Sequence, residues 1–526
     1  MKNKMLKPLL FSLTLFLTSC GQTSSNNNVS SLEESSFNET SSSVTSETSS
    51  KESDSTSDSS VTVVKKDLYA SSTGNREGDG SKENPYDFIT GVKNLTYGST
   101  LYLLGGTYAF NSSQTITSLI TATDITDSHP ANSEEQRRVI TPAIRDGKQE
   151  KVIFDFSSMS YSSSNRGISL NSDYWTVQDF EVKGAGDNGI YIGGNHNIVK
   201  HMDVHDCSDT GIQLGRRQSK DTTIESWPSY NSIINCTSHD NHDPSGEDSD
   251  GFACKLTTGV GNLFDGCIAY NNVDDGWDLY TKGDSGPIGP VTLKNCIAFN
   301  NGITSYGVGT ANSDGNGFKL GGESIAVPHV VDNCIAFNNL ATGFTDNSNP
   351  GTIRVTNCTS YNNGVRDLEA NNFDFCRDTA TSVNYFKNLL SYCDGYRISP
   401  IDGVKAKSNS RDEYKGTVSH SIFYSGLSML KFDEIQDCDY TLSTKCGTAY
   451  KEPNGLSPFV STTTPQPQAS KDVPASVHND IHTLLRDEEG NVKLGDFLKV
   501  NPNSAFATLG ENSTPLGADL SGGNKE

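Results

Sequence analysis

The chain has 526 residues and a formal net charge of −23 at neutral pH. So acidic a protein lacks the basic surface that nucleic-acid binding requires, and we expect no nucleic-acid partner. Its length allows one large elongated domain or two ordinary ones.

The first nineteen residues are typical of an export signal. Three lysines precede an apolar run over residues 9–17, which is too short to span a bilayer. The sequence Leu-Thr-Ser-Cys-Gly that follows resembles the lipobox of bacterial lipoproteins, whose cysteine carries the lipid. We therefore expect a signal peptide over residues 1–19, a membrane anchor at Cys20 and an extracytoplasmic location. An ordinary secretory signal with an incidental cysteine is the alternative.

Residues 20–62 are rich in Ser, Thr, Asn and Glu and contain almost nothing apolar. Such a segment cannot bury enough surface to offset the entropy of ordering, so we expect a disordered tether. The remaining residues, 63–526, are expected to form a single domain because repeats run through them. Cys438, Cys446 and a Pro/Ser/Thr-rich stretch interrupt the repeats, and for residues 436–485 we expect loops packed against that domain.

One motif recurs five times in this domain, with cysteine spacings of 31, 29, 38 and 24 residues. The copies are NCTSHDN at Asn235, GCIAYNN at Gly266, NCIAFNN at Asn295 and Asn333, and NCTSYNN at Asn357. Each copy alternates in polarity, ends in Asn and lacks a helical period. The pattern predicts an all-β solenoid of about ten stacked coils, with parallel strands and long loops on one face.

Stacked coils place like residues in columns. The cysteine column is either free and buried or paired between adjacent rungs. The aromatic column consists of Tyr270, Phe299, Phe337 and Tyr361. The asparagine column consists of Asn271, Asn300, Asn338 and Asn362. Asn suits that corner because it tolerates left-handed backbone and its amide can bond the next rung.

A glycine before a bulky residue marks the start of the next strand in each coil. Three successive coils read Ser249-Asp250-Gly251-Phe252, Asp274-Asp275-Gly276-Trp277-Asp278 and Asn316-Gly317-Phe318-Lys319. Aligned on their glycines, Asp250 lies about 4.8 Å from Asp275, and Asp278 lies one rung from Lys319. Four carboxylates, those of Asp250, Asp274, Asp275 and Asp278, and the Lys319 amine are therefore expected on one patch.

This patch predicts a calcium site. Four carboxylates so close need a counter-ion, and oxygen ligands select a hard cation, for which we expect Ca²⁺. A purely stabilising calcium site or a plain ladder of Asp turns would show the same spacing. Lys319 favours catalysis, because a nearby divalent cation lowers the pKa of an amine and makes it a usable proton acceptor. Alone, it would be a solvated surface lysine.

The same motifs resemble the family 9 polysaccharide lyases, whose best-known members are pectate lyases. The resemblance rests on DDGWDLY from Asp274, DGF from Asp250, DGNGFKLGG from Asp314 and the repeated NCIAFNN, and it covers roughly residues 67–510. It implies a right-handed parallel β-helix. It also implies that Lys319 is the catalytic base and that the four aspartates bind Ca²⁺.

The resemblance further implies a calcium-dependent pectate lyase that cleaves (1→4)-α-D-galacturonan by β-elimination. Lys319 would accept the C5 proton that the bound Ca²⁺ acidifies, leaving a C4–C5 double bond in the product. The alternatives are a lyase for another uronan, such as rhamnogalacturonan or alginate, an exo-acting polygalacturonate lyase, a hydrolase, or a non-catalytic glycan-binding surface lipoprotein. We expect a monomer.

Further substrate contacts are expected around the patch. Loops between Cys236 and Asp250, and between Cys296 and Asn316, are long enough to wall a groove for polygalacturonate or pectin. Four nearby cations could meet further substrate carboxylates, although each could also be a plain surface charge. They are Lys282, Arg354, Arg216 and Arg217.

Overall fold

A computed structural model describes residues 65–117, 133–364, 371–375, 384–394, 403–404, 414–425, 428–438, 447–465 and 484–522. All of them belong to one compact unit, Thr62–Glu526. The expected signal peptide, the lipid anchor at Cys20 and the whole of the expected tether lie outside the described residues, as does Cys446. Within the described ranges, no helix has the length and apolar character needed to cross a membrane.

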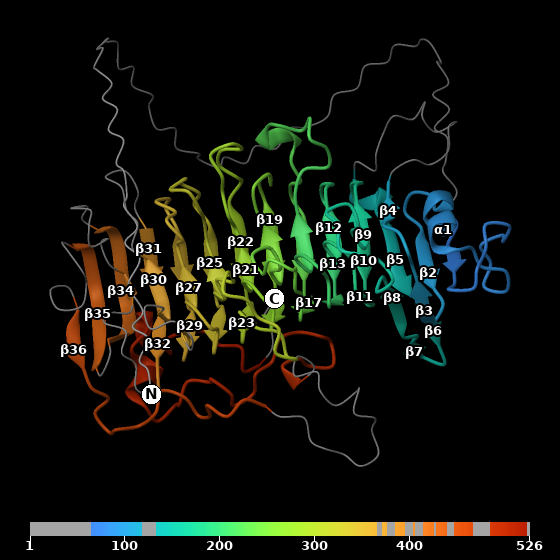
Figure 1. Cartoon of the computed structure of the whole chain (residues 1–526). Coiled ribbons are helices and arrows are strands. Elements are labelled where there is room, and N and C mark those ends of the chain that lie inside the picture. Colours follow the sequence, from blue (N-terminus) through green and yellow to red (C-terminus); the bar gives the residue numbers. More distant parts are fainter. Residues whose placement is uncertain are drawn as a thin grey trace, which may run out of the picture. The chain divides into compact units, whose positions relative to one another are not determined.

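Ten short parallel strands form the sheet that carries the predicted patch. In chain order they are β4 (Gln114–Ile116), β9 (Ile168–Leu170), β12 (Ile190–Ile192), β15 (Ile212–Leu214), β18 (Phe252–Cys254), β21 (Trp277–Asp278), β24 (Phe318–Lys319), β27 (Phe344–Thr345), β30 (Phe373–Phe375) and β33 (Gly403–Val404). Each strand pairs with the one before it and the one after it, so every coil adds one rung (Figure 1).

Two more columns of parallel strands complete the coils. The first column consists of β1 (Leu68–Ala70), β2 (Thr100–Leu103), β5 (Arg138–Pro142), β10 (Trp175–Gln178), β13 (Ile198–Lys200), β16 (Ser232–Ile234), β19 (Asn262–Asp265), β22 (Val291–Lys294), β25 (Val330–Asp332), β28 (Arg354–Thr356) and β31 (Asn384–Lys387). The second column consists of β3 (Gly106–Ala109), β8 (Val152–Asp155), β11 (Glu181–Lys183), β14 (Asp203–His205), β17 (Thr237–His239), β20 (Ile268–Tyr270), β23 (Ile297–Phe299), β26 (Ile335–Phe337), β29 (Thr359–Tyr361) and β32 (Leu390–Tyr392). β34 (Tyr414–Ser425) pairs with the last strand of both columns. The all-β solenoid of parallel strands is therefore confirmed.

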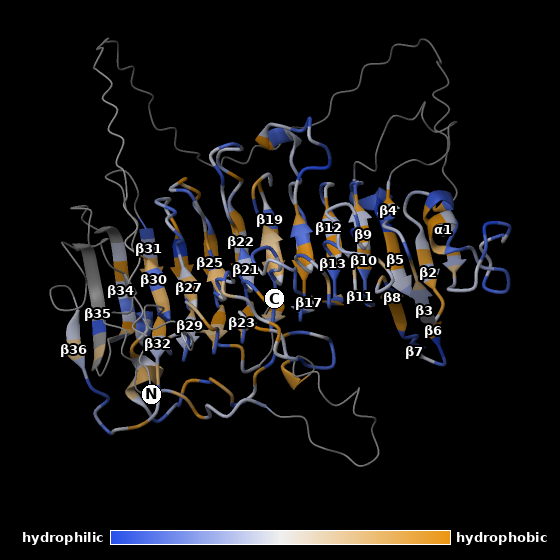
Figure 2. Cartoon of the chain, viewed as in Figure 1, coloured by the Kyte–Doolittle hydropathy of each residue, from blue (hydrophilic) through white to orange (hydrophobic). Residues whose placement is uncertain are grey.

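The core lies inside the coils, where hydrophobic residues alternate with polar ones along the strands (Figure 2). Its stacks follow the parallel register: Phe252, Trp277 and Phe318 lie face to face with ring centroids 4.7 and 4.8 Å apart. Eight cysteines of the described part are buried and free, which decides between the two alternatives for their column. They are Cys207, Cys236, Cys254, Cys267, Cys296, Cys334, Cys358 and Cys393.

Asparagines form the corner between the second column and the ten-stranded sheet. The predicted left-handed conformation is confirmed at Asn271, Asn300, Asn338 and Asn362, with φ between 52° and 54°. The predicted bonds to the next coil are present at Asn271, which donates to the Ile303 carbonyl at 3.3 Å, and at Asn362, which donates to Asp394 Oδ1 at 2.8 Å. The asparagine that follows each corner residue forms a second, buried ladder. Asn301 donates its backbone and side-chain N–H groups to the Asn339 side-chain oxygen at 3.1 and 2.8 Å, and Asn339 donates in the same way to Asn363. The first asparagine turns the chain outward, so only the second points into the coil.

The two ends of the solenoid are covered. Helix α1 (Phe88–Asn94), which Asp87 caps, packs against β1, β2 and β4 at the N-terminal end (Figure 1). At the other end, β34 pairs antiparallel with β35 (Ser428–Cys438), which pairs with β36 (Thr448–Tyr450). The hairpin of β6 (Ile144–Arg145) and β7 (Lys148–Gln149) and the 3₁₀ turns η2 (Glu134–Gln136) and η3 (Ile224–Ser226) lie in loops.

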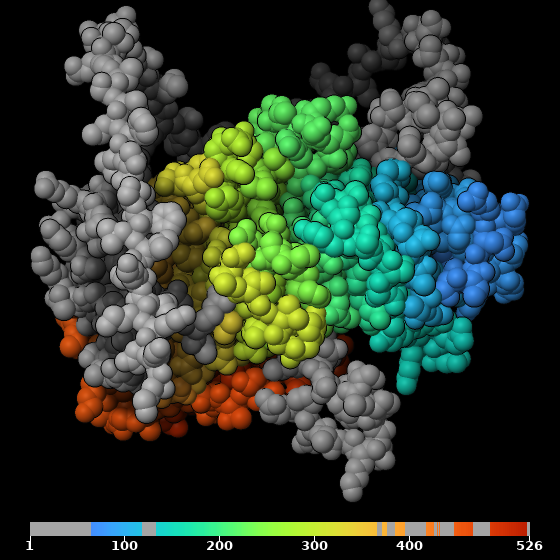
Figure 3. Space-filling model, in the orientation of Figure 1, coloured from blue at the N-terminus to red at the C-terminus, as the bar shows by residue number. Residues whose placement is uncertain are grey.

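The C-terminal residues 484–522 cover the outer face of the second column. Leu485, Phe497 and Leu516 pack on its outward aromatic and aliphatic side chains, and Phe459 joins them. This segment contains η5 (Ala505–Thr508) and η6 (Glu511–Ser513), and its orange and red atoms lie along one side of the middle coils (Figure 3). Where they are described, residues 436–485 therefore include loops packed on the solenoid, as expected, but also strand β36.

Candidate active site

The predicted register of the acidic patch is confirmed. β18, β21 and β24 are consecutive rungs, and Ala253, Asp278 and Lys319 are register partners on them. Asp250 and Asp275 occupy the turns before β18 and β21, and the Asp275 backbone N–H donates to the Asp250 carboxylate at 3.2 Å. The alignment on glycines therefore places these side chains on adjacent rungs.

Glycine is required at the strand starts because the coils approach closely there. A Cβ at Gly251 would lie 2.6 Å from the Ala269 Cβ, and one at Gly276 would lie 2.6 Å from the Gly317 carbonyl oxygen. A larger residue would push the turns apart. The glycines thus hold the aspartate-bearing turns in contact from one rung to the next.

The aspartates form a buried, oxygen-rich cluster. Carboxylate oxygens of Asp250, Asp274 and Asp275 all lie within 4.8 Å of one another. Lys255 joins Asp278 to the cluster, since its Nζ lies 2.7 Å from Asp250 Oδ2 and 3.2 Å from Asp278 Oδ2. All four predicted aspartates are therefore brought together, each with at most 4% of its surface exposed.

Burial makes it costly for these carboxylates to be ionised without a compensating positive charge. Burial, together with the nearby Asp278 and Asp275, raises the pKa of Asp250 well above its ordinary value, although Lys255 opposes the shift. Burial likewise raises the pKa of Asp275 to about 6, against the pull of Lys319. Buried carboxylates with raised pKa values and only oxygen donors are what a hard divalent cation stabilises. The residues present therefore fit Ca²⁺.

Lys319 lies on the wall of the cluster, where its Nζ contacts Asp314 Oδ2 at 2.8 Å and Asp275 Oδ2 at 3.1 Å. Burial lowers the pKa of Lys319, but Asp275, Asp278 and Asp314 outweigh burial and raise it above the ordinary lysine value. The sequence argument expected a lowered pKa beside a cation. The pKa of Lys319 would fall only if a cation bound the carboxylates, such as that of Asp275, that contact the Lys319 ammonium in this structure.

Sequence reasoning missed Lys255 and Asp314. Each completes a pair in which a lysine follows its aspartate by five residues, Asp250 with Lys255 and Asp314 with Lys319. The shared spacing could have revealed both pairs, because a lysine at the end of a short strand, such as Lys319, or just past it, such as Lys255, can reach back to the turn before the strand. Burial lowers the pKa of Lys255, but Asp250 and Asp278 outweigh it and raise that pKa well above its ordinary value.

An acidic cleft of about 480 Å³ opens over the cluster. Its lining residues are Glu247, Asp248, Lys255, Leu256, Asp274, Asp278, Tyr280, Lys282, Asn312, Asp314 and Lys319. Both predicted loops contribute to it, and the Thr310 hydroxyl and the Asn312 amide bond the Ser245 carbonyl across them at 3.2 and 3.3 Å. The expected walls over the site are present.

A basic cleft of about 550 Å³ adjoins the acidic one and shares Lys255, Leu256 and Lys282 with it. Arg216 and Arg217 line it as predicted, and Arg166, which sequence reasoning missed, lies beside them. Trp227 and Tyr191 add aromatic surface. The basic cleft therefore combines cations and rings next to the aspartates.

Arg354 lies apart from these residues. It belongs to β28 of the first column, and its guanidinium lies 4.3 Å from the centre of the Tyr385 ring. It lines neither cleft. We expected Arg354 among the cations near the site, but its strand belongs to the first column and faces a different side of the coil.

Comparisons with known proteins give one consistent match. A family model described as the Pel9A-like, right-handed β-helix region matches residues 68–385. Pectate lyase L of Paenibacillus polymyxa (strain SC2) is 46% identical over 461 residues, covering 88% of this chain and 87% of that protein.

Solved structures agree in fold. The crystal structure of pectate lyase Pel9A matches with a TM-score of 0.61 at 25% identity, covering 88% of this chain and 98% of the other. A rhamnogalacturonan lyase structure matches with a TM-score of 0.58 at 20% identity, covering 83% and 96%, and this likeness concerns the fold alone. The expected right-handed parallel β-helix is confirmed.

Proposed function

The chain belongs to the Pel9A-like right-handed β-helix family and is a polysaccharide lyase, and we propose that it cleaves pectate by calcium-assisted β-elimination. Pectate is a (1→4)-linked α-D-galacturonan, each residue of which carries a C6 carboxylate. The observation that carries the proposal is the Lys319 amine, which lies on a cleft wall directly beside a buried aspartate cluster.

Asp250, Asp274, Asp275 and Asp278 would hold the calcium ion. Their donors are all oxygens, and a divalent cation would relieve the burial cost that raises the pKa values of Asp250, Asp274 and Asp275. When bound, Ca²⁺ would neutralise the C6 carboxylate of the substrate and so acidify the neighbouring C5 proton.

Lys319 would accept that proton on Nζ. The electrons of the C5–H bond form the C4–C5 double bond, the C4–O bond breaks, and the leaving oxygen takes a proton from water. If Asp275 binds the calcium ion instead of Lys319, Asp314 remains 2.8 Å from the amine and can stabilise the ammonium that forms. The Asp314 side chain is 54% exposed, so the proton has a short route to solvent.

The basic cleft would bind neighbouring sugars of the chain. Arg166, Arg216, Arg217 and Lys282 supply cations for further C6 carboxylates, and Trp227 offers a ring face for a sugar. This placement would explain how so acidic a protein holds a polyanion, because these cations gather beside the proposed calcium site. A non-catalytic glycan-binding role would leave the Lys319 geometry without a purpose.

The decisive experiment follows the absorbance of unsaturated ends on three substrates: polygalacturonate, rhamnogalacturonan and alginate. We expect turnover on polygalacturonate that a chelator abolishes and added Ca²⁺ restores. Lys319→Ala should retain the fold and lose about 10²-fold or more in rate, as expected for loss of a general base. Lys294→Ala, a lysine on β22 outside both clefts, is the matched control and should retain full rate.

Each outcome decides a part of the proposal. Turnover that survives chelation removes the metal from the chemistry, and an active Lys319→Ala removes the lysine as base. A preference for rhamnogalacturonan or alginate replaces the substrate but keeps the elimination. The product sizes distinguish internal cleavage from release of end units.

We also propose that the mature protein is held at a membrane by a lipid on Cys20, outside the cytoplasm. The lipobox-like sequence around Cys20 supports this. Cys20→Ala should move the protein from the membrane fraction to the medium. An unchanged membrane fraction would exclude the anchor.

A further inference from the structure

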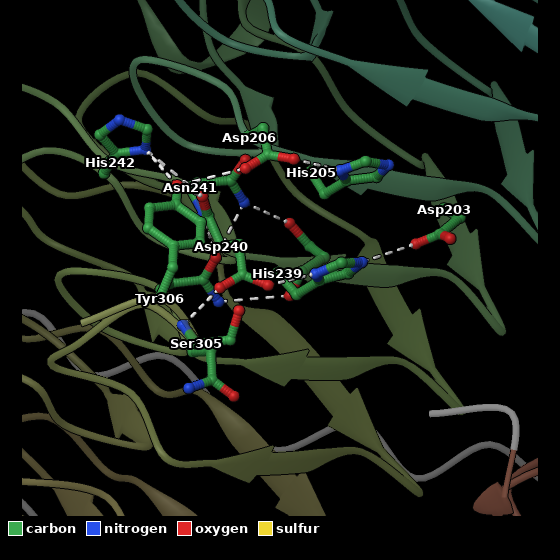
Figure 4. Close-up of polar contacts among 12 residues, drawn as sticks. Asp203, His205, Asp206, His239, Asp240, Asn241, His242, Ser305 and Tyr306 are labelled. Carbon is green, nitrogen blue, oxygen red and sulfur yellow. Dashed lines mark hydrogen bonds and ion pairs between the residues drawn. The ribbon is translucent and has the colours of Figure 1, made fainter. Parts of the chain in front are cut away.

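A second group of ionisable side chains lies on the outer face of the second column, at β14 and β17 (Figure 4). Asp203 and His205 point outward from β14, because Val204 between them is buried. His239 is the register partner of His205 on the next rung, and the two imidazole rings stack with centroids 4.8 Å apart and an angle of 10°. One ligand atom from each of the three side chains lies within 4.8 Å of the others.

Each imidazole is oriented by the aspartate that follows it. His205 Nδ1 lies 2.7 Å from Asp206 Oδ2, and His239 Nδ1 lies 2.8 Å from Asp240 Oδ2. These short contacts are charge-assisted hydrogen bonds, in which Nδ1–H donates. Metal-binding histidines commonly have such a carboxylate behind them, which directs the other ring nitrogen at the ion.

The other ring nitrogens face carboxylates across wider gaps. His239 Nε2 lies 3.3 Å from Asp203 Oδ1, and His205 Nε2 lies 3.4 Å from Glu181 Oε1. Both gaps exceed the roughly 2.7–2.9 Å of a charge-assisted hydrogen bond. Two ligands bound about 2.0 Å from a tetrahedral ion stand about 3.3 Å apart, which is the separation of His239 Nε2 and Asp203 Oδ1. A ring nitrogen of His205 lies within 4.8 Å of both atoms, so the His205 ring would have to turn toward the ion to bind it.

We propose that Asp203, His205 and His239 form a binding site for a divalent transition-metal ion of the Zn²⁺ class. Imidazole nitrogens with one carboxylate oxygen favour such ions over Ca²⁺, which prefers oxygen alone. Three protein ligands leave a position for water, and the Asp203 side chain, 27% exposed, keeps that side open to solvent. The site is chemically distinct from the all-oxygen aspartate cluster.

Protons compete for the same position. Burial lowers the pKa of His239, but the Asp203 and Asp240 carboxylates outweigh it and raise that pKa to about 9. Asp203, Asp206, Asp240 and Glu181 surround the two rings, and one divalent ion carries the same charge as the two protons it would displace. The surrounding carboxylates therefore stabilise either two imidazole protons or one divalent ion. The ion would in addition form a bond to a nitrogen of each imidazole.

The proposed site also touches the loop that carries Asp314. The Ser305 backbone N–H donates to Asp240 Oδ1 at 2.6 Å, and the Tyr306 hydroxyl donates to Asp206 Oδ1 at 3.2 Å (Figure 4). The carboxylates that orient the imidazoles thus also hold this loop. A bound ion would fix them in place and stiffen the loop at its base.

The test uses tag-free full-length protein, stripped with chelator and then saturated with Ca²⁺ so that the aspartate cluster is filled. Co²⁺ is titrated in, its visible d–d bands are followed, and Zn²⁺ is added as competitor. We expect one equivalent of Co²⁺ in a nitrogen-containing site, displaced by Zn²⁺. His239→Gln should abolish this binding, and Asp240→Asn should weaken it by about 10–100-fold.

His196→Gln is the matched control, because His196 stacks between Tyr174 and Tyr230 away from the cluster and its loss should change nothing. If His239→Gln does not fold, Asp203→Asn, at the open side of the site, provides the same comparison. The absence of Co²⁺ bands, or binding that survives His239→Gln and Asp203→Asn, would overturn the proposal. Imidazoles that stay doubly protonated by NMR in excess Zn²⁺ would show a site for protons alone.

Discussion

Two lysines reach the aspartate cluster from different rungs, and their surroundings separate their roles. Lys255 contacts Asp250 and Asp278, which are at most 4% exposed, and its own surface is 7% exposed. Lys319 contacts buried Asp275 on one side and the exposed Asp314 on the other. Lys255 is therefore suited to neutralise the cluster permanently, whereas Lys319 has an exit for a proton.

His329 predicts how stability depends on pH. It is fully buried, its Nδ1 accepts the Val291 backbone N–H at 3.1 Å, and burial lowers its pKa to about 3. In the unfolded chain this imidazole takes up a proton near pH 6.5, whereas in the folded protein it stays neutral down to about pH 3. The contribution of His329 to the free energy of unfolding is therefore complete above pH 6.5 and is lost on acidification toward pH 3. The slope is about 1.4 kcal/mol per pH unit.

His329→Gln should remove that slope, since the Gln carbonyl can still accept the Val291 N–H. Between pH 7 and pH 5, urea denaturation should show that the wild type loses about 2 kcal/mol more than the variant. Equal losses would mean that another group titrates in this range. The comparison within one variant pair cancels the contribution of the carboxylates.

At the residue scale, the site was predictable wherever backbone columns decide position. In-register parallel stacking turns a sequence alignment into neighbours in space, which is how Asp250, Asp275 and Lys319 were found. Lys255 and Asp314 escaped because long side chains and loop residues lie off the columns. The five-residue spacing from Asp250 to Lys255 and from Asp314 to Lys319 is visible in the sequence, but it does not align with the repeated columns that gave the other positions.

At the scale of elements, each corner needs a residue with left-handed backbone and a side chain that bonds the neighbouring coil, and two adjacent asparagines meet these two requirements. The first Asn of each pair takes the left-handed conformation, and the second satisfies buried backbone groups of neighbouring coils. The pattern in the sequence predicted both demands but assigned them to one residue. The two roles fall on different residues because adjacent side chains point to opposite sides of the chain.

Asn339 should therefore matter more than Asn338. Asn339 is fully buried and links Asn301 to Asn363 through its amide. Asn339→Ala would leave several buried donors and acceptors without partners and should cost at least about 2 kcal/mol in urea denaturation. The neighbouring Asn338→Gly keeps the left-handed corner, with φ now at 54°, and should cost no more than about 1 kcal/mol. Equal costs would contradict the division of labour.

The C-terminal elements could not be predicted from the repeat. Residues 484–522 have no columns of their own, and their position follows from the apolar outer face they cover. Arg486 fixes one end of this segment by donating to the Cys236 and Gly266 carbonyls, 250 and 220 residues away in the chain. Contacts at such separation leave no local signal in the sequence.

On the scale of the whole molecule, the distribution of charge matters more than the net −23. The basic cleft gathers Arg166, Arg216, Arg217 and Lys282 beside a cluster that a cation would neutralise. A basic cleft on an otherwise acidic body attracts a polyanion to that cleft. Binding should weaken as salt screens these contacts.

Replacing both Arg216 and Arg217 by Ala should raise KM for polygalacturonate by at least about tenfold, with little change in kcat. Loss of a charge-assisted contact is worth roughly 1.4 kcal/mol or more, which is a factor of ten. The salt dependence of KM should flatten as well. Arg354→Ala, an arginine outside both clefts, is the control, and an equal effect there would argue for long-range charge rather than contact.

The coverings at the two ends have a consequence for self-assembly. A stack of parallel strands presents, at its first and last rungs, backbone groups on which another copy could continue the same ladder. Here α1 packs at one end, and at the other β34 turns from parallel to antiparallel pairing. The change of strand direction breaks the template, so a second copy cannot continue the same parallel ladder at that end.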